Sequence, residues 1–176
     1  MANPGCYPAG ALLALAPLLR AGAVALRGIV IDAKSGVSGA GRGGRSSGYA
    51  FAETNEDARA YSVVGHNHTA EIEQELGAQA GGEVRVAFVP HLIPMTRGIL
   101  VTAYAPLARQ LTTPEALALY QRAYAGEPFV RVLPDGALPQ TKARPSWQST
   151  TTFKIFREIY LSRFSSCGWT PSIPPS

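Results

Sequence analysis

The chain has 176 residues, 46% of them hydrophobic and 16% charged, which is typical of one globular domain with a buried core and excludes a disordered chain. Its formal net charge of +4 comes from lysines and arginines scattered along the sequence, so we expect a small anionic substrate and no nucleic acid. Two cysteines do not make a secreted disulfide framework. The apolar stretch 11–26 is interrupted by Pro17, Arg20 and Gly22, so we expect no membrane contact and a cytoplasmic protein.

The first predicted helix runs over Ala11–Leu19 and ends at Arg20–Gly22. The segment NPGCYPAG (3–10) precedes it and places Cys6 in a turn that leads into the helix. Backbone N–H groups and the positive end of a helix dipole favour a thiolate at such a position. Cys6 is therefore a candidate nucleophile, and the alternative of an ordinary small apolar residue stays open.

A β-branched run closed by turn residues predicts a buried strand over Gly28–Gly36. The following Gly/Ser-rich stretch 37–50 contains Arg42 and Arg45, and it lacks the spacing of a dinucleotide fingerprint. We interpret it as a loop that bares backbone amides and guanidinium groups to an anion, with a flexible surface loop as the alternative.

Further along, His68–Gly82 has the pattern of a short amphipathic helix with Thr69 as its cap. The segments Glu83–Ile93 and Gly98–Leu107 are strand-like and joined by PMTRG. A helix is predicted over Thr113–Gly126, with Thr113 as N-cap, Pro114 at N1 and Gly126 as terminator, followed by a short strand in EPFVRVLP. This order indicates an antiparallel or mixed sheet with helices on one face.

Three histidines are available as partners for Cys6. His66 and His68 are two residues apart and point the same way in an extended segment, so either a base for the thiol or part of a metal site fits them. With so few ligand residues we predict no metal, and we interpret His68 as a hydrogen-bonding residue at the helix entry. His91 is interpreted as a packed core or loop residue.

Charged side chains provide the remaining candidates. Arg97, between two strands, has the fork that binds carboxylate or phosphate, or is a solvated hairpin residue. Glu71 and Glu73 head the predicted helix, where carboxylates complement the dipole. That local role is enough for Glu73, whereas Glu71 is the better placed to lie beside His66.

Five segments resemble, in order and spacing, N-acetyl-gamma-glutamyl-phosphate reductase of arginine biosynthesis: NPGCYPAG, DAKSGVSGAGR, HNHTAEIEQEL, PHLIPMTRGIL and YAGEPFVRVLPDGALPQTK. The resemblance implies NADPH-dependent reduction of an acyl phosphate to the semialdehyde and phosphate through a cysteine thioester. It also implies an α+β domain with a mixed, largely antiparallel sheet and helices on one face, like the catalytic domain of glyceraldehyde-3-phosphate dehydrogenase, in a homo-oligomer. The roles that it implies are nucleophile for Cys6, catalytic histidine for His66, and substrate binding for Arg42, Arg97 and Glu71. The residues that bind NADP(H) stay unknown, with Ser38 and Gly39 as candidates.

Two departures from that family shape the expectations. The family has a Rossmann part before the cysteine, whereas this chain starts at the cysteine motif. Residues 1–142 are therefore expected to form the catalytic domain, and 143–176 a divergent tail, frame-altered or disordered. Without the Rossmann part and the family's returning C-terminal segment, the domain is expected to expose apolar surface on one side, which promotes association. Activity of the chain alone and its binding of NADP(H) are left open. The alternatives are a non-enzymatic remnant that keeps an oligomer interface, a reductase of carrier-bound aminoadipyl phosphate from lysine biosynthesis, and a thiol hydrolase using Cys6 and His66.

Overall fold

The computed structural model describes residues 4–41, 51–141 and 151–153. Within these ranges the elements follow in the order α1 (Cys6–Arg20), β1 (Ile29–Ser35), the 3₁₀ helix η1 (Val37–Ala40), α2 (Phe51–Thr54), β2 (Arg59–Ala60), α3 (Asn67–Ala80), β3 (Val86–Leu92), β4 (Ile99–Tyr104), α4 (Thr113–Ala123), β5 (Val130–Val132) and β6 (Thr151–Phe153).

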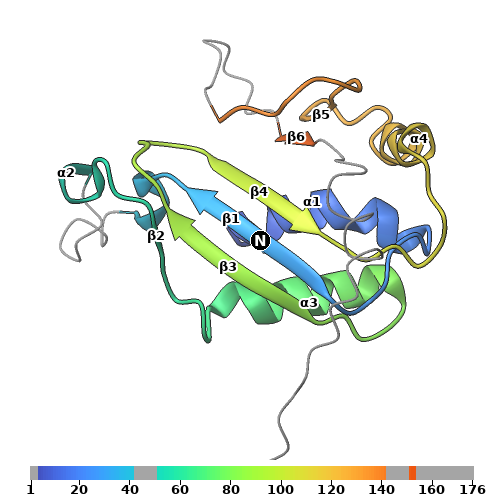
Figure 1. Ribbon diagram of the computed structural model, residues 1–176, viewed down its shortest axis with the longest axis horizontal. Helices are drawn as coiled ribbons and strands as arrows, with labels where there is room; N and C mark the ends of the chain where they lie inside the picture. Colours follow the sequence, from blue (N-terminus) through green and yellow to red (C-terminus); the bar gives the residue numbers. More distant parts are fainter. Residues whose placement is uncertain (1–3, 42–50, 142–150, 154–176) are drawn as a thin grey trace, which may run out of the picture.

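The main sheet has the strand order β2-β3-β1-β4 (Figure 1). β1 pairs in parallel with β3 and antiparallel with β4, and β2 is antiparallel to β3. The expected mixed sheet is confirmed. A hairpin between β3 and β4 is not formed, because β1 lies between the two strands that PMTRG connects.

The core lies between the sheet and the pair α1 and α3, which run side by side across one face (Figure 1). Alternate residues of β1 point into it: Ile29, Ile31 and Ala33 are buried, whereas Val30 on the other face is 37% exposed. A period of two places every second side chain of a strand on the same face. The expected one-sided arrangement of helices is thus confirmed for these two helices.

Helix α1 begins at Cys6, five residues before the predicted start, and continues through Pro17. Proline has no N–H, so Pro17 leaves the carbonyl of Leu13 without its usual helical partner. The hydroxyl of Tyr124, just after α4, donates to that carbonyl at 2.6 Å, and Tyr120 of α4 donates to the carbonyl of Ala14. Helix α4 therefore stabilises α1 at its proline.

Two predicted helix caps are wrong by one to three residues. The N-cap of α3 is His66 and not Thr69, since the His66 side chain accepts a hydrogen bond from the N–H of His68. The N-cap of α4 is Thr112 and not Thr113, because Thr112 and Glu115 form a complete capping box.

The bounds of α4 also differ from the prediction. Because Thr112 is the N-cap, Pro114 is the second residue of the helix (N2), and the helix ends before Tyr124, so Gly126 lies in the following turn.

The predicted tail is described only in part. β5 pairs in parallel with β6, whose residues belong to the segment expected to be a divergent tail. Arg42 and Arg45 lie outside the described residues.

Candidate functional site

Several of the predicted site residues meet where β1 and β3 end, at the side of the sheet to which their arrows point in Figure 1. Three segments come together here: the turn into α1, the entry of α3, and the loop pair formed by η1 and residues 95–98. The turn that carries Cys6 thus lies beside Glu71 and His68 of α3.

Cys6 is the first residue of α1, and it is exposed. Gly5 is the N-cap of α1, and no side-chain hydrogen bond caps the helix there. Instead, the N–H of Gly5 donates to Oε1 of Glu71 at 2.9 Å. A side chain at position 5 has no room, since a Cβ there would lie 2.6 Å from Nε2 of His68. The cysteine turn is therefore packed directly against α3.

His66 and His68 are both half-buried, with ring centroids 4.8 Å apart. His66 uses Nδ1 to accept the N–H of His68 at 3.1 Å, so the helix-entry hydrogen bond expected of His68 is made by His66. Burial, and secondarily the neighbouring His68, lowers the pKa of His66. The His66 ring is therefore neutral at neutral pH, with Nε2 left for proton transfer.

The ring of Tyr7, with Phe88 packed against it, forms an aromatic wall beside both imidazoles, and neither residue was a candidate from the sequence. The ring of Tyr7 lies edge-on at 5.9 Å from each of His66 and His68, and Phe88 packs at 5.3 Å from Tyr7. The Tyr7 hydroxyl shares a hydrogen bond of 2.9 Å with that of Tyr61, and burial raises the pKa of Tyr7 despite this bond. No local signal separates Tyr7 from an ordinary apolar helix residue.

The η1 segment differs from the expected anion-binding loop. The N–H of Ser38 donates to the carbonyl of Thr96 at 3.1 Å, and that of Gly39 donates to Gly36 at 3.3 Å. These amides are used within the loop pair and are not bared to a ligand, because the backbone turns tightly here. The two loops touch so closely that a Cβ at Gly36 would lie 2.8 Å from the N of Arg97. Arg97 itself is exposed, so its side chain is accessible to an anion.

His91 is neither a core nor a loop residue, contrary to the prediction. It lies in β3 on the face of the sheet away from α1 and α3, with Nδ1 at 3.1 Å from Oδ1 of Asp32. Lys34 contacts the second oxygen of Asp32. His91 therefore belongs to a charged group outside the candidate site.

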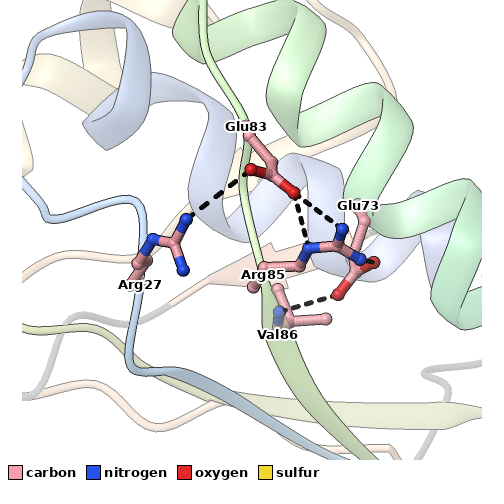
Figure 2. Close-up of polar contacts among 5 residues, drawn as sticks. All are labelled: Arg27, Glu73, Glu83, Arg85 and Val86. Carbon is pink, nitrogen blue, oxygen red and sulfur yellow. Dashed lines mark hydrogen bonds and ion pairs between the residues drawn. The ribbon is translucent and has the colours of Figure 1, made fainter.

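Glu73 also differs from the expectation. Helix α3 begins at Asn67, so neither Glu71 nor Glu73 lies in its first turn. Figure 2 shows that Glu73 accepts the N–H of Val86 at 3.1 Å and pairs with Arg85, and a second carboxylate, Glu83, contacts both Arg85 and Arg27. This network joins α3 to the start of β3, the end of that strand opposite the cysteine turn.

The described ranges contain neither a metal-binding cluster nor a membrane-spanning helix. No group of three or more histidine, cysteine or acidic side chains there is arranged to hold a metal ion. None of the helices described is long and apolar enough to cross a membrane.

Comparisons with known proteins agree with this geometry. N-acetyl-gamma-glutamyl-phosphate reductase from Moorella thermoacetica is 56% identical over 142 residues, and that from Pelotomaculum thermopropionicum is 58% identical over 142 residues. Each alignment covers 81% of this chain but 41% of the relative. The chain thus spans about two fifths of the length of the curated relatives it matches.

Solved structures show the same fold at low sequence identity. Aspartate semialdehyde dehydrogenase II from Vibrio cholerae superposes with a TM-score of 0.60 at 14% identity, over 80% of this chain and 47% of that one. The enzyme from Francisella tularensis gives 0.54 at 15% identity, over 74% of this chain and 46% of that one. A family model described as semialdehyde dehydrogenase, dimerisation domain, matches residues 6–156. The chain therefore belongs to the semialdehyde dehydrogenase family, as its dimerisation domain.

Proposed function

We propose that this chain carries the acyl-transfer half of an N-acetyl-gamma-glutamyl-phosphate reductase of arginine biosynthesis, acting in the cytoplasm. The observation that supports it most is the packing of the Cys6 turn against α3, with Glu71 bonded to Gly5 and His68 in contact with the same turn. The names of the relatives supply the reaction class, an acyl phosphate reduced to an aldehyde.

The first chemical step needs only an exposed thiolate and an acyl phosphate. The sulfur of Cys6 attacks the acyl carbon, the bond from that carbon to the phosphate oxygen breaks, and inorganic phosphate leaves with the bonding pair. A thioester remains on Cys6. A thioester accepts hydride more readily than a carboxylate, which is the chemical reason for covalent catalysis before reduction.

The histidine pair is the proposed acid–base element. His66, whose pKa is lowered by burial, is neutral. Because its Nδ1 accepts the N–H of His68, its proton lies on Nε2, from where it can polarise the acyl carbonyl and be donated during the reaction. His68 shares the aromatic wall and lies at the cysteine turn itself, so removing each ring separately distinguishes their roles.

Arginines are the proposed anion holders. Arg97 is exposed beside η1 and offers a fork for a phosphate or carboxylate. Arg42 is proposed for the same task from its match to the family motif. Glu71 is proposed to meet a polar group of the substrate through Oε2, since its Oε1 is bonded to Gly5.

NADP(H) is the proposed hydride donor of the complete reaction. The candidates Ser38 and Gly39 do not fit a phosphate cradle, because their amides are hydrogen-bonded to Thr96 and Gly36. These two residues therefore do not fit the nucleotide, and the proposal for this chain ends at the thioester.

Self-association is proposed through the sheet face that α1 and α3 leave open. Across the three long strands this face carries Val30, Ala87, Val89, Leu100 and Tyr104 around the Asp32 group, as the strand register requires. Val30 is 37% exposed and Tyr104 43%, and exposed apolar surface of this kind marks an association site. The description of the matching family, a dimerisation domain, points to a second copy as the partner.

The acyl-transfer proposal is tested by intact mass. A Cys167→Ala chain is mixed with N-acetylglutamyl phosphate in the absence of NADPH, and an acyl adduct is sought on Cys6. Cys6→Ala gives the background, while His66→Ala and His68→Ala separate the two imidazoles.

An adduct that forms faster than background, and more slowly without one of the imidazoles, supports the proposal. A folded chain that forms no adduct contradicts it and favours the non-enzymatic remnant. An adduct that turns over rapidly with water, without hydride, favours the thiol hydrolase.

A further inference from the structure

We propose that Glu71 is the positioning residue of the reactive cysteine: by holding the N–H of Gly5, its carboxylate fixes the turn from which Cys6 enters α1. This inference rests on the proposed role of Cys6 as nucleophile. It assigns Glu71 a structural task at the site in addition to any contact with substrate.

The first observation is the way in which both backbone groups of Gly5 are held. Its N–H donates to Oε1 of Glu71 at 2.9 Å across 66 residues of sequence, and its carbonyl accepts the N–H of Ala9 at 3.0 Å in the first turn of α1. Hydrogen bonds to a charged carboxylate are stronger than neutral ones. The two peptide planes that flank Gly5 are thus each held: Glu71 of α3 holds the plane before Gly5, and the first turn of α1 holds the plane between Gly5 and Cys6.

The second observation is the lack of space around that turn. A Cβ on Gly5 would lie 2.6 Å from Nε2 of His68 and 2.9 Å from Oε2 of Glu71. His68 and Glu71 are three residues apart, so they share one face of α3. A single helix therefore presents both the imidazole and the group that holds the cysteine turn, and it sets their relative position.

The consequence of these two observations is orientation. A turn held in one place converts the attack of Cys6 on the acyl carbon into a positioned event.

The test compares Glu71→Gln and Glu71→Ala, each in the full chain with Cys167→Ala. Glu73→Ala is the matched control, because Glu73 also lies on α3 and also accepts a backbone N–H, that of Val86 at 3.1 Å, at the other end of β3 (Figure 2). Three quantities are measured: the rate of Cys6 acylation by N-acetylglutamyl phosphate, the pH profile of Cys6 alkylation by iodoacetamide, and hydrogen exchange of the Gly5 amide.

We expect Glu71→Ala to slow acylation by about a hundredfold, the usual effect of misplacing a reacting group, and to remove protection of the Gly5 amide. Glu71→Gln keeps an acceptor oxygen for Gly5, so we expect a protected amide and an acylation rate that falls clearly less than in Glu71→Ala. Glu73→Ala is expected to leave both quantities unchanged. Glu71→Ala is expected to change the rate of Cys6 alkylation, because the turn that carries the thiol is released, whereas Glu71→Gln keeps the turn in place.

The proposal is overturned if Glu71→Ala and Glu73→Ala acylate at the same rate. It is also overturned if Glu71→Gln falls as far as Glu71→Ala, since the charge and not the hydrogen bond would then be decisive. If the parent chain forms no acyl adduct, the proposed function fails. In that case Gly5 exchange and Cys6 alkylation still decide the role of Glu71, because unchanged values in Glu71→Ala refute it.

Discussion

The proline inside α1 leads to a prediction about coupling between two helices. Pro17 removes the N–H that would bond the carbonyl of Leu13, and Tyr124 supplies a hydroxyl to the same carbonyl at 2.6 Å. Tyr124→Phe keeps the ring and removes this donor, leaving a partly buried carbonyl without a partner. We expect the free energy of unfolding to fall by about 1–2 kcal/mol, from the lost bond and the unpaired carbonyl.

In a Pro17→Ala background the helix regains its own donor to Leu13. The same Tyr124→Phe change should then cost about 0.5 kcal/mol, so the coupling between the two positions is about 1 kcal/mol. The assay is urea unfolding of the parent, both single variants and the double variant, followed by circular dichroism. Equal costs of Tyr124→Phe in the two backgrounds would refute the reasoning, because Tyr124 would then not be compensating for the proline.

Three further predictions concern the cap of α4, the open sheet face and alkaline pH. Thr112→Ala removes a capping box and should lower the unfolding free energy by about 1 kcal/mol in urea titrations, and an unchanged midpoint would contradict this. Val30→Lys places a charge on the open sheet face and should weaken self-association in sedimentation equilibrium, whereas Gln74→Lys on the exposed side of α3 should not; equal effects would count against this interface. Burial raises the pKa of Tyr124 to about 12, so its contribution to stability is full below the unfolded pKa of 10.0 and is lost as pH rises toward 12. Thermal unfolding across this pH range should show the loss of stability, and the loss should be smaller in Tyr124→Phe.

The regular elements were largely predictable because their signals are local. The β-branched run and the turn residues around it predict a strand over Gly28–Gly36, and the structure has one over Ile29–Ser35. The four-residue spacing of Ile72 and Leu76 predicts the buried side of α3, and both are fully buried. Such patterns need no knowledge of distant residues.

What sequence reasoning missed depends on contacts between distant residues. A helix through Pro17 was predicted, but not the hydrogen bond from Tyr124, 111 residues from Leu13, to the carbonyl that the proline leaves without a helical partner. The strand order also escapes local reasoning, since PMTRG has the composition of a hairpin connection while β1 separates its two strands.

The candidate site shows the same division. The resemblance brought Cys6, His66 and Glu71 into one group, and the helix-capping role of His66 followed only from the path of the chain into α3. Tyr7 was missed because its partner Tyr61 is 54 residues away.

The central place of β1 in the sheet has a consequence for synthesis on the ribosome. Both of its neighbours, β3 and β4, are encoded later, and Ile29 meets its partner Val86 only across 57 residues. Closing a loop of that length before any strand pair forms is slow compared with helix formation. During translation, α1 is therefore made long before the sheet and α3 that bury its apolar side, and we expect the chain to need a chaperone most at this stage.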